Sequence, residues 1–138
     1  MVIEPLNFES RPSLKNPILI LSFAGWSDAG SAATTASRYM CDQLLAKRFA
    51  SIDPEEFYDF SVQRPVVRLN ENKEREIHWP SYDFFYGEGI GAQADFVFGV
   101  GVEPQLRWRA FTDTMLRFIR ECRVGMLVTL GAYLDEVL

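Results

Sequence analysis

Three carboxylates of this sequence each follow a segment of apolar residues, where side chains that carry chemistry often lie. They are Asp28 in FAGWSDAGS, Asp59 in DPEEFYDF and Glu103 in GVGVEPQ. Ligands of open α/β sheets bind at the carboxyl ends of the strands, so these acids are expected at one edge of the sheet. If they converge, they form a site for a hard metal ion or for acid/base chemistry. The alternative is structural, because isolated carboxylates at helix starts are usually caps.

The segment FAGWSDAGSAA has the glycine spacing of a phosphate-binding loop without its other residues. Gly25 and Gly30 give the G-x-x-x-x-G pattern. The next two residues, Ser31 and Ala32, stand where the motif requires Lys and then Ser or Thr. Asp28 would cap the free N–H groups of the following helix and repel an incoming anion. We therefore predict a self-capped strand-to-helix turn that meets a protein surface or a cationic or neutral ligand.

The segment FGVGVEP begins like a dinucleotide-binding fingerprint but does not complete it. Pro104 occupies the position of the third glycine and suits the first turn of a helix instead. We interpret Gly99 and Gly101 as allowing a tight exit from a strand. Glu103 remains well placed to hold a cation or a donor-rich ligand, since it stands between a strand end and a helix start.

Residues for histidine or thiol chemistry are scarce. His78 is the single histidine, and the alternation in EIHWP predicts that it lies on the polar side of a strand. Cys41 and Cys122 fall inside predicted helices without a CxxC or histidine partner, so we expect reduced, buried thiols and no structural zinc. We expect neither a bound metal nor a cofactor.

The composition is that of an ordinary globular chain. Of 138 residues, 48% are hydrophobic and 24% are charged, which is enough chain for one α/β domain with a core. The net charge of -5 and the scattered basic residues argue against a nucleic-acid partner. The first twenty residues carry charges and too short an apolar run for a signal peptide or a membrane span, so we expect a cytoplasmic protein without membrane contact.

The hydrophobic pattern predicts an α/β fold of three layers, in which helices flank a largely parallel sheet. Buried strands are expected at residues 17–23, 94–101 and 124–131, and a further strand is expected at 48–52. An antiparallel hairpin excursion is expected within 65–80 and a flexible loop at 87–92. The chain ends a few residues after the last of these strands. We therefore expect residues 1–138 to be a single domain and the N-terminal part of a longer protein.

Three helices are expected between these strands. Asp53-Pro54-Glu55-Glu56 resembles a short helical start. The first long helix carries a stripe of small and apolar residues, and the second carries larger ones. The first stripe comprises Ala29, Ala33, Ala36, Met40 and Leu44, and the second comprises Trp108, Phe111, Met115, Phe118, Ile119 and Cys122.

Aromatic residues gather near two of the strand ends. Trp26, Phe57, Tyr58 and Phe60 are most simply core and rim residues. If several of them are exposed together, they mark an interface instead, because Trp and Tyr are enriched at binding hot spots.

Four stretches share the order and spacing of a known family along nearly the whole chain. They are PILILSFAGWSDAGSAA, FASIDPEEFYDF with Arg64-Pro65, IHWP, and GVEPQLRWRAF. In combination they resemble the proteasome assembly chaperone family of the second-subunit type, in its bacterial branch. Members of that family are about twice this length, which agrees with the expectation of a longer protein.

The resemblance implies an α/β fold akin to nucleoside phosphorylases and related hydrolases, with members that oligomerise. For the eukaryotic and archaeal branches it implies binding to proteasome α subunits, aided by a C-terminal hydrophobic-tyrosine-X tail. This sequence ends in Glu136, Val137 and Leu138 and so lacks that tail. The resemblance assigns no catalytic residue. An older association of the branch with ATP-dependent carboxylate-amine ligases gains no support from the missing phosphate lysine, although such ligases bind ATP by other means.

Two functions follow from these observations. The first is a proteasome-assembly-chaperone-like protein that acts as an oligomeric assembly or interaction protein without enzymatic activity, and whose partners are other copies of itself and proteasome subunits. The alternative is a small-molecule or nucleotide-related enzyme of the ligase, phosphorylase or hydrolase type, with its site at the carboxyl ends of the strands. The candidate ligand or interface residues are Gly25, Trp26, Asp28, Asp59 and Glu103.

Overall fold

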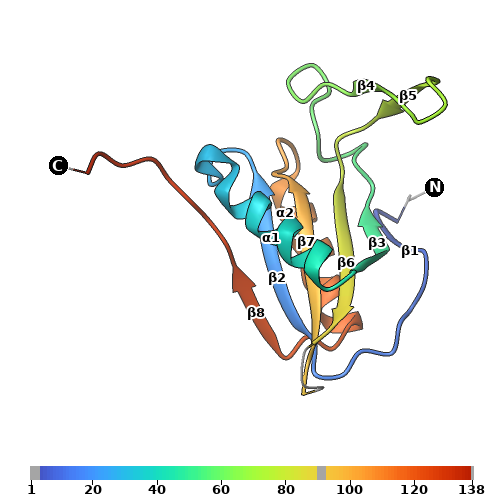
Figure 1. Cartoon of the computed structure of the whole chain (residues 1–138), viewed down its shortest axis with the longest axis vertical. Helices are drawn as coiled ribbons and strands as arrows, with labels where there is room; N and C mark the ends of the chain where they lie inside the picture. Colours follow the sequence, from blue (N-terminus) through green and yellow to red (C-terminus); the bar gives the residue numbers. More distant parts are fainter. Residues whose placement is uncertain (1–3, 90–92, 138) are drawn as a thin grey trace.

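The computed structural model describes residues 4–89 and 93–137. Most of its strands belong to one sheet, with two long helices packed against it (Figure 1). The strands of this sheet are β1 (Leu6–Phe8), β2 (Ile18–Ala24), β3 (Lys47–Ile52), β6 (Tyr82–Glu88), β7 (Asp95–Val102) and β8 (Met126–Thr129). The helices are α1 (Ala32–Gln43), preceded by the short 3-10 turn η1 (Ala29–Ser31), and α2 (Trp108–Glu121). A separate hairpin consists of β4 (Val66–Leu69) and β5 (Arg75–His78).

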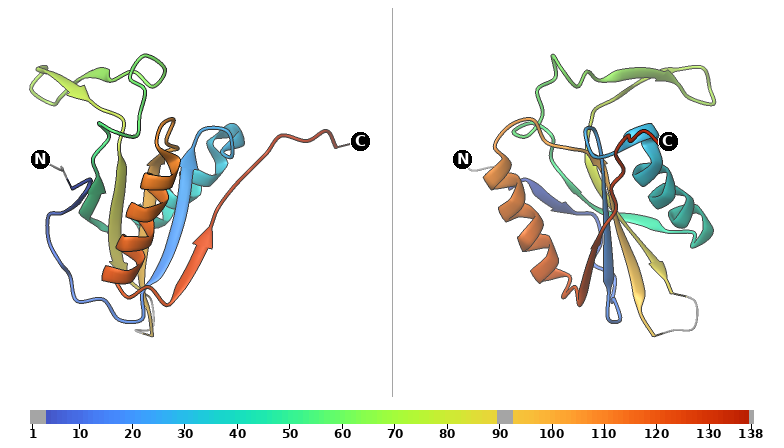
Figure 2. Two further views of the ribbon diagram at one scale, coloured as in Figure 1. Left: turned by 180° about the vertical axis from the view of Figure 1, so that it is seen from behind. Right: turned by 90° about the vertical axis from the view of Figure 1, so that its left-hand side faces the viewer.

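Within the described residues, the sheet has six strands in the order β1-β3-β6-β7-β2-β8. β2 pairs in parallel with β7 on one side and with β8 on the other. The pairs β7 with β6, β6 with β3 and β3 with β1 are antiparallel. Four strands, β2, β3, β7 and β8, consequently point in the same direction. The helices α1 and α2 cover opposite faces of the sheet (Figure 2). The predicted three-layer α/β fold with a hairpin excursion is confirmed, and the sheet is mixed.

The adjacent strands β2 and β7 lead into helices on opposite faces, since α1 follows β2 and α2 follows β7. We call the place where their carboxyl ends meet the switch point. In open α/β sheets, ligands bind at such points because the two departing chains leave room between them. The fold thus brings the segments after Ala24 and after Val102 next to each other.

The larger part of the core lies between the sheet and α2. Phe84 of β6 and Phe118 of α2 are both fully buried, and their rings stack with centroids 3.7 Å apart. The α1 side is thinner, with Ile20, Phe98 and Val100 as its buried apolar residues. Because aromatic rings bury large apolar areas, the α2 layer supplies most of the hydrophobic stabilisation.

Several expected elements differ in the structure. The segment after Asp53 is not a helix: the N–H groups of Phe57 and Tyr58 both donate to the carbonyl of Pro54 at 3.1 Å, which makes an isolated turn. β1 and β6 were not predicted. β1 has only three residues, which is too short for a hydrophobic pattern. β6 lies inside the sheet and packs on both faces, with Phe84 facing α2 and Phe85 facing α1, so the sequence of β6 does not alternate between apolar and polar residues. β6 also includes the start of the predicted loop at 87–92, of which 90–92 lie outside the described residues.

The region around β7 and α2 also corrects two expectations. β7 continues through Gly99 and Gly101, so these glycines do not form a tight exit. A Cβ at Gly101 would lie 2.2 Å from the carbonyl oxygen of Ser81, so the absent side chain permits close packing against the neighbouring segment. α2 begins at Trp108, which leaves Pro104 outside the helix, and Trp108 itself is exposed because it stands at the first position.

Helix α1 packs through its smallest residues. Ser37 is fully buried and Ala33 nearly so, whereas Ala36, expected in the buried stripe, is exposed. Small side chains let the helix axis approach the sheet closely. Cys41 and Cys122 are free thiols and half-buried, and burial raises the pKa of each to about 11. Both are therefore protonated and unreactive near neutral pH.

The hairpin β4–β5 stands apart from the sheet and overhangs its α1 side (Figure 2). Its register runs from Val66 opposite His78 to Leu69 opposite Arg75, and all eight strand residues are exposed. His78 thus lies on a solvated strand, as predicted. In the described part of the chain, no helix has the length and apolar character needed to cross a membrane.

Candidate functional site

The loop after β2 and the loop after β7 are joined at the switch point by Glu103. Its carboxylate Oε1 accepts a hydrogen bond from the backbone N–H of Trp26 at 3.1 Å, and its own N–H donates to the carbonyl of Ala24 at 2.9 Å. Gly25 has a φ of +139°, and a Cβ there would lie 2.4 Å from Glu103 Cδ. Only glycine fits this position, for both conformational and steric reasons. The structure therefore brings Gly25, Trp26 and Glu103 together.

Asp28 caps the start of α1. Its Oδ1 accepts hydrogen bonds from the backbone N–H groups of Ala33 at 2.8 Å and Thr34 at 3.1 Å, and its Oδ2 accepts one from Thr34 Oγ1 at 2.6 Å. Burial opposes the charged form, but the hydrogen bonds outweigh it and hold the pKa of Asp28 below its ordinary value. The predicted self-capped turn is confirmed. A carboxylate that accepts three hydrogen bonds at the positive end of a helix holds a proton weakly, so it is a poor general base.

Asp59 lies in a separate local network. Its Oδ1 accepts hydrogen bonds from the hydroxyl and the backbone N–H of Ser61, which lower the pKa of this exposed carboxyl. The side chain of Gln105 connects the backbone of Asp59 to the switch point: the N–H of Asp59 donates to Gln105 Oε1 at 3.1 Å, and Gln105 Nε2 donates to the carbonyl of Glu103 at 3.0 Å.

The three acids consequently do not form one cluster. Among residues 4–89 and 93–137, no group of three or more His, Cys, Asp and Glu side chains lies close enough together to hold a metal ion. The carboxylates instead stabilise the turns in which they stand. Their shared position at one edge of the sheet follows from topology, but their side chains point to different partners.

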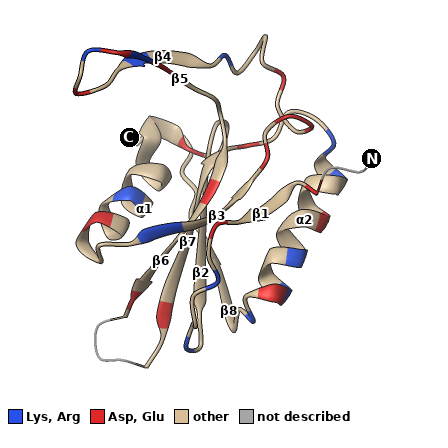
Figure 3. Ribbon diagram, turned by 90° about the vertical axis from the view of Figure 1, so that its right-hand side faces the viewer, with Lys and Arg blue, Asp and Glu red and all other residues tan. Residues whose placement is uncertain are grey.

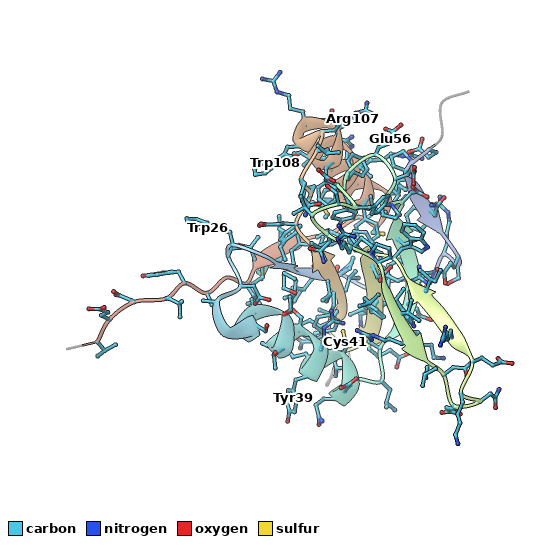
Figure 4. All side chains as sticks on the ribbon, turned by 90° about the horizontal axis from the view of Figure 1, so that it is seen from above. Trp26, Tyr39, Cys41, Glu56, Arg107 and Trp108 are labelled. Atoms are coloured by element: carbon cyan, nitrogen blue, oxygen red, sulfur yellow. The ribbon has the colours of Figure 1, made fainter. Side chains whose placement is uncertain are left out.

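Trp26 is the exposed residue of the switch point. Its side chain is 92% exposed and points away from the body of the molecule, on the side of the C-terminal tail (Figure 4). The other aromatics named in the sequence behave differently: Phe57 and Tyr58 are buried, and Phe60 packs edge-on against Trp79. The four therefore do not form one exposed group.

An open apolar groove of about 790 Å³ runs between the loop after β2 and the segment after β8. We call it the Trp26 groove; it is lined by Gly25, Trp26, Ser27, Ala29, Gly131, Ala132, Tyr133 and Leu134. The backbone holds its two sides together, since Ala29 N–H donates to the carbonyl of Ala132 at 3.1 Å and Ala132 N–H donates to that of Ser27 at 2.8 Å. The side chains of Tyr133 and Leu134 are 84% and 88% exposed.

Tyr133 and Leu134 were missed as candidates in the sequence. Neither residue belongs to a local motif that marks a site, and only the three acids Asp28, Asp59 and Glu103 were expected at the carboxyl edge of the sheet. The proximity of Tyr133 and Leu134 to Trp26 depends on the parallel pairing of β8 with β2, which places the two exits side by side.

Comparisons with known proteins agree with this geometry. The profile of the PAC2 family matches residues 22–137. The structure is similar to that of a PAC2 family protein from Streptomyces avermitilis, with a TM-score of 0.81 and 38% identity over 86% of this chain and 51% of that chain. It is also similar to a proteasome-assembly chaperone homologue from Mycobacterium tuberculosis, with a TM-score of 0.80 and 37% identity over 86% of this chain and 50% of that one.

A more distant similarity concerns the fold alone. An archaeal proteasome activator from Pyrococcus furiosus superimposes with a TM-score of 0.69 at 20% identity, over 96% of this chain and 53% of the other. The chain thus spans about half the length of the solved relatives it matches. No protein with a curated functional description shows significant similarity to it.

Proposed function

Since this chain belongs to the PAC2 family, we propose that it is a cytoplasmic, oligomeric assembly or interaction protein of the proteasome-assembly-chaperone type. Its proposed partners are other copies of the chain and proteasome α subunits. The similarity at 37% identity to a protein described as a proteasome-assembly chaperone homologue supports this choice of partner.

The exposure of Trp26 is the observation that carries the proposal. A tryptophan that leaves 92% of its side chain in water stabilises neither the core nor the loop in which it stands. Beside it, Tyr133 and Leu134 extend the same apolar surface along the Trp26 groove. Exposed aromatic residues next to an apolar groove are typical of the centre of a protein interface, where Trp and Tyr contribute most of the binding energy.

The hydrogen bonds at the switch point support the same conclusion. Glu103 fixes the backbone of Trp26, and Asp28 fixes the start of the helix that follows. Both carboxylates thereby hold the loop that presents Trp26 in one conformation. A preordered loop loses less conformational entropy when it binds a partner.

Retention of purified proteasome α subunits from the source organism on the immobilised chain tests this proposal. We expect Trp26→Ala to weaken retention by about tenfold or more, as for a typical hot spot. Trp108→Ala is the matched control, because Trp108 is also exposed but stands at the start of α2. If the native chain retains no more than an unrelated protein does, the partner is wrong. If both variants bind as the native chain does, the Trp26 groove is not the interface.

The alternative is a small-molecule or nucleotide-related enzyme, and the position of Glu103 favours it. Glu103 lies at the carboxyl end of β7, beside the switch point, where α/β enzymes bind their ligands. A thermal-shift screen with nucleotides, nucleosides and divalent metal ions tests this function. Glu103→Gln is a sharper variant than Asp28→Ala, because loss of the cap would destabilise the fold by itself. A ligand-induced shift that Glu103→Gln abolishes would favour the enzyme, and a flat screen would count against it.

A further inference from the structure

The hairpin β4–β5 and the α1 face of the sheet enclose a pocket of about 340 Å³. Its floor includes Phe85 of β6 and Val100 of β7, and it reaches Ala24 and Val102 at the carboxyl ends of β2 and β7. We call it the hairpin pocket. It lies on the opposite side of the switch point from the Trp26 groove, and the two share no lining residue.

The hairpin turns one particular face toward this pocket. Residues directly opposite each other in an antiparallel pair share a face, as do residues two apart along a strand. The pairs Val66 with His78 and Arg68 with Glu76 therefore share one face, and Arg75 lies on the other. The pocket is lined by Val66, Arg68 and His78, so theirs is the inner face.

Three arginines from different parts of the chain line the pocket. Arg38 comes from α1, Arg64 from the segment before β4, and Arg68 from the hairpin. Figure 3 shows basic residues both on α1 and on the hairpin that overhangs it. Within residues 4–89 and 93–137, none of these three guanidinium groups has a hydrogen bond or an ion pair, whereas those of Arg48, Arg107 and Arg117 pair with carboxylates.

Asp83 and Glu76 lie close to the pocket, and each contacts residues other than the three arginines. Asp83 lines the wall, but its Oδ1 lies 3.2 Å from Arg48 Nε and its Oδ2 accepts a hydrogen bond from Ser81 Oγ at 2.9 Å. Glu76 lies opposite Arg68 on the inner face of the hairpin. Its Oε1 accepts a hydrogen bond from Asn70 Nδ2 at 3.0 Å, and its Oε2 lies 3.8 Å from Nε2 of His78, which lines the pocket.

Arg38 also interacts electrostatically with the carboxylate of Asp28, which helps to lower the pKa of that acid. A protein with a net charge of -5 thus gathers three arginines around one pocket, and Arg64 and Arg68 have no ion pair among the described residues. Such like charges repel one another until an anion joins them.

We propose that the hairpin pocket binds a small molecule that carries a phosphate group. Guanidinium groups form charge-assisted, often bidentate hydrogen bonds with phosphate oxygens, and three arginines line this pocket. Phe85, Val100 and Trp79 offer apolar contact to the rest of the molecule. The volume suits a ligand no larger than a mononucleotide, since small-molecule sites begin at roughly 300 Å³.

This site differs from the phosphate loop that the sequence excluded. The turn after β2 has Asp28 at the helix start, which repels anions, and its neighbouring groove is apolar. The hairpin pocket draws its positive charge from side chains that are far apart in sequence. They line one pocket because the hairpin lies over the α1 face of the sheet (Figure 2).

Calorimetric titration of the chain with inorganic phosphate, adenosine monophosphate, adenosine and succinate tests the proposal. We expect adenosine monophosphate and phosphate to bind, with adenosine monophosphate the tighter of the two, and adenosine and succinate to bind at least about tenfold more weakly. Arg64→Gln or Arg68→Gln should weaken phosphate binding by about tenfold, the cost of one charge-assisted contact. Arg75→Gln is the matched control, because it removes the same charge from the outer face of the same hairpin.

Each contrary result overturns the proposal. If neither phosphate nor adenosine monophosphate binds, or if succinate binds as tightly as phosphate, the site is not specific for a phosphate group. If Arg68→Gln and Arg75→Gln weaken binding equally, net charge rather than the pocket is responsible. Equal thermal unfolding midpoints of the two variants establish that the comparison concerns folded protein. The Trp26→Ala variant should bind phosphate normally, so this test is independent of the proposed assembly function.

Discussion

At the scale of single residues, the acids of the switch point act on the backbone around them. Asp28 satisfies two N–H groups at the start of α1 together with the hydroxyl of Thr34, and Glu103 satisfies the N–H of Trp26. Helix N-termini leave N–H groups without partners, and a carboxylate there also interacts favourably with the helix dipole. These two acids therefore constrain the backbone of the loop that carries Trp26.

Asp28→Asn should lower the free energy of unfolding by about 1 kcal/mol at pH 7, because the neutral amide makes weaker hydrogen bonds and loses the dipole interaction. The pKa of Asp28 is lower in the folded than in the unfolded chain, so its stabilisation is complete above the unfolded pKa of about 4. That stabilisation is lost as the pH falls through the folded pKa. Urea denaturation of both proteins between pH 7 and pH 3 should show the difference shrinking at the acid end.

Asp42→Asn provides the control for this experiment. Asp42 is exposed near the end of the same helix, where a negative charge is unfavourable, so its removal should not destabilise the chain. An Asp28→Asn variant as stable as the native chain at pH 7 would mean that the charge contributes nothing to the cap.

At the scale of elements, the two faces of the sheet are built differently. α2 packs through aromatic residues, with Phe118 against Phe84 and Phe111 against Tyr82, whereas α1 approaches through Ala33 and Ser37. The hairpin β4–β5 contributes little to either layer, since Val67 and Ile77 remain about 60% exposed. An isolated hairpin is marginally stable in water. The hairpin nevertheless forms one wall of the hairpin pocket, through Val66, Arg68 and His78.

Phe118→Ala should cost about 3–5 kcal/mol in the free energy of unfolding, because it empties a fully buried aromatic site under α2. Leu116→Ala on the same helix should cost less than about 1 kcal/mol, since Leu116 is 44% exposed. Chemical denaturation measures both. Should Phe118→Ala fail to fold, Phe118→Leu is the milder variant and should still cost more than Leu116→Ala. Equal costs at the two positions would contradict the assignment of the core to the α2 face.

At the scale of the whole molecule, one side of the sheet remains uncovered. β8 is the last strand in the order, and in the described part of the chain no strand pairs with its outer edge. Met126 and Leu127 are 58% and 48% exposed, and the Trp26 groove continues this apolar surface beyond the end of the strand. An exposed apolar edge offers unpaired N–H and C=O groups to another strand. It is therefore a natural surface for the self-association that we propose.

Leu127→Lys should reduce self-association of the chain, because a charged side chain on an edge strand disfavours pairing with a further strand. Light scattering after size exclusion, over a range of protein concentrations, measures the mass in solution. Leu116→Lys is the control, since it adds the same charge to a similarly exposed position on α2. If both variants associate as the native chain does, the edge of β8 is not the contact. If the native chain has the mass of one copy at every concentration, the proposed homo-oligomer is wrong.

The amino-acid sequence by itself determined the elements whose signals are local. Continuous apolar runs predicted β2, β7 and β8, and the periodicity of Phe111, Met115 and Phe118 predicted the body of α2. Two strand-like segments on either side of the polar residues 70–73 predicted the hairpin. The capping role of Asp28 was also predictable, because its donors lie five and six residues away. Such features depend on residues that are near one another along the chain.

The tertiary structure alone decided which distant segments meet. The Trp26 groove requires the parallel pairing of β8 with β2, and the hairpin pocket requires the hairpin to lie over the α1 face of the sheet (Figure 2). The sequence placed three acids at one sheet edge but did not show that their side chains turn to separate partners. It also presented Arg38, Arg64 and Arg68 as scattered charges, because their convergence depends on strand order and packing, which no local pattern records.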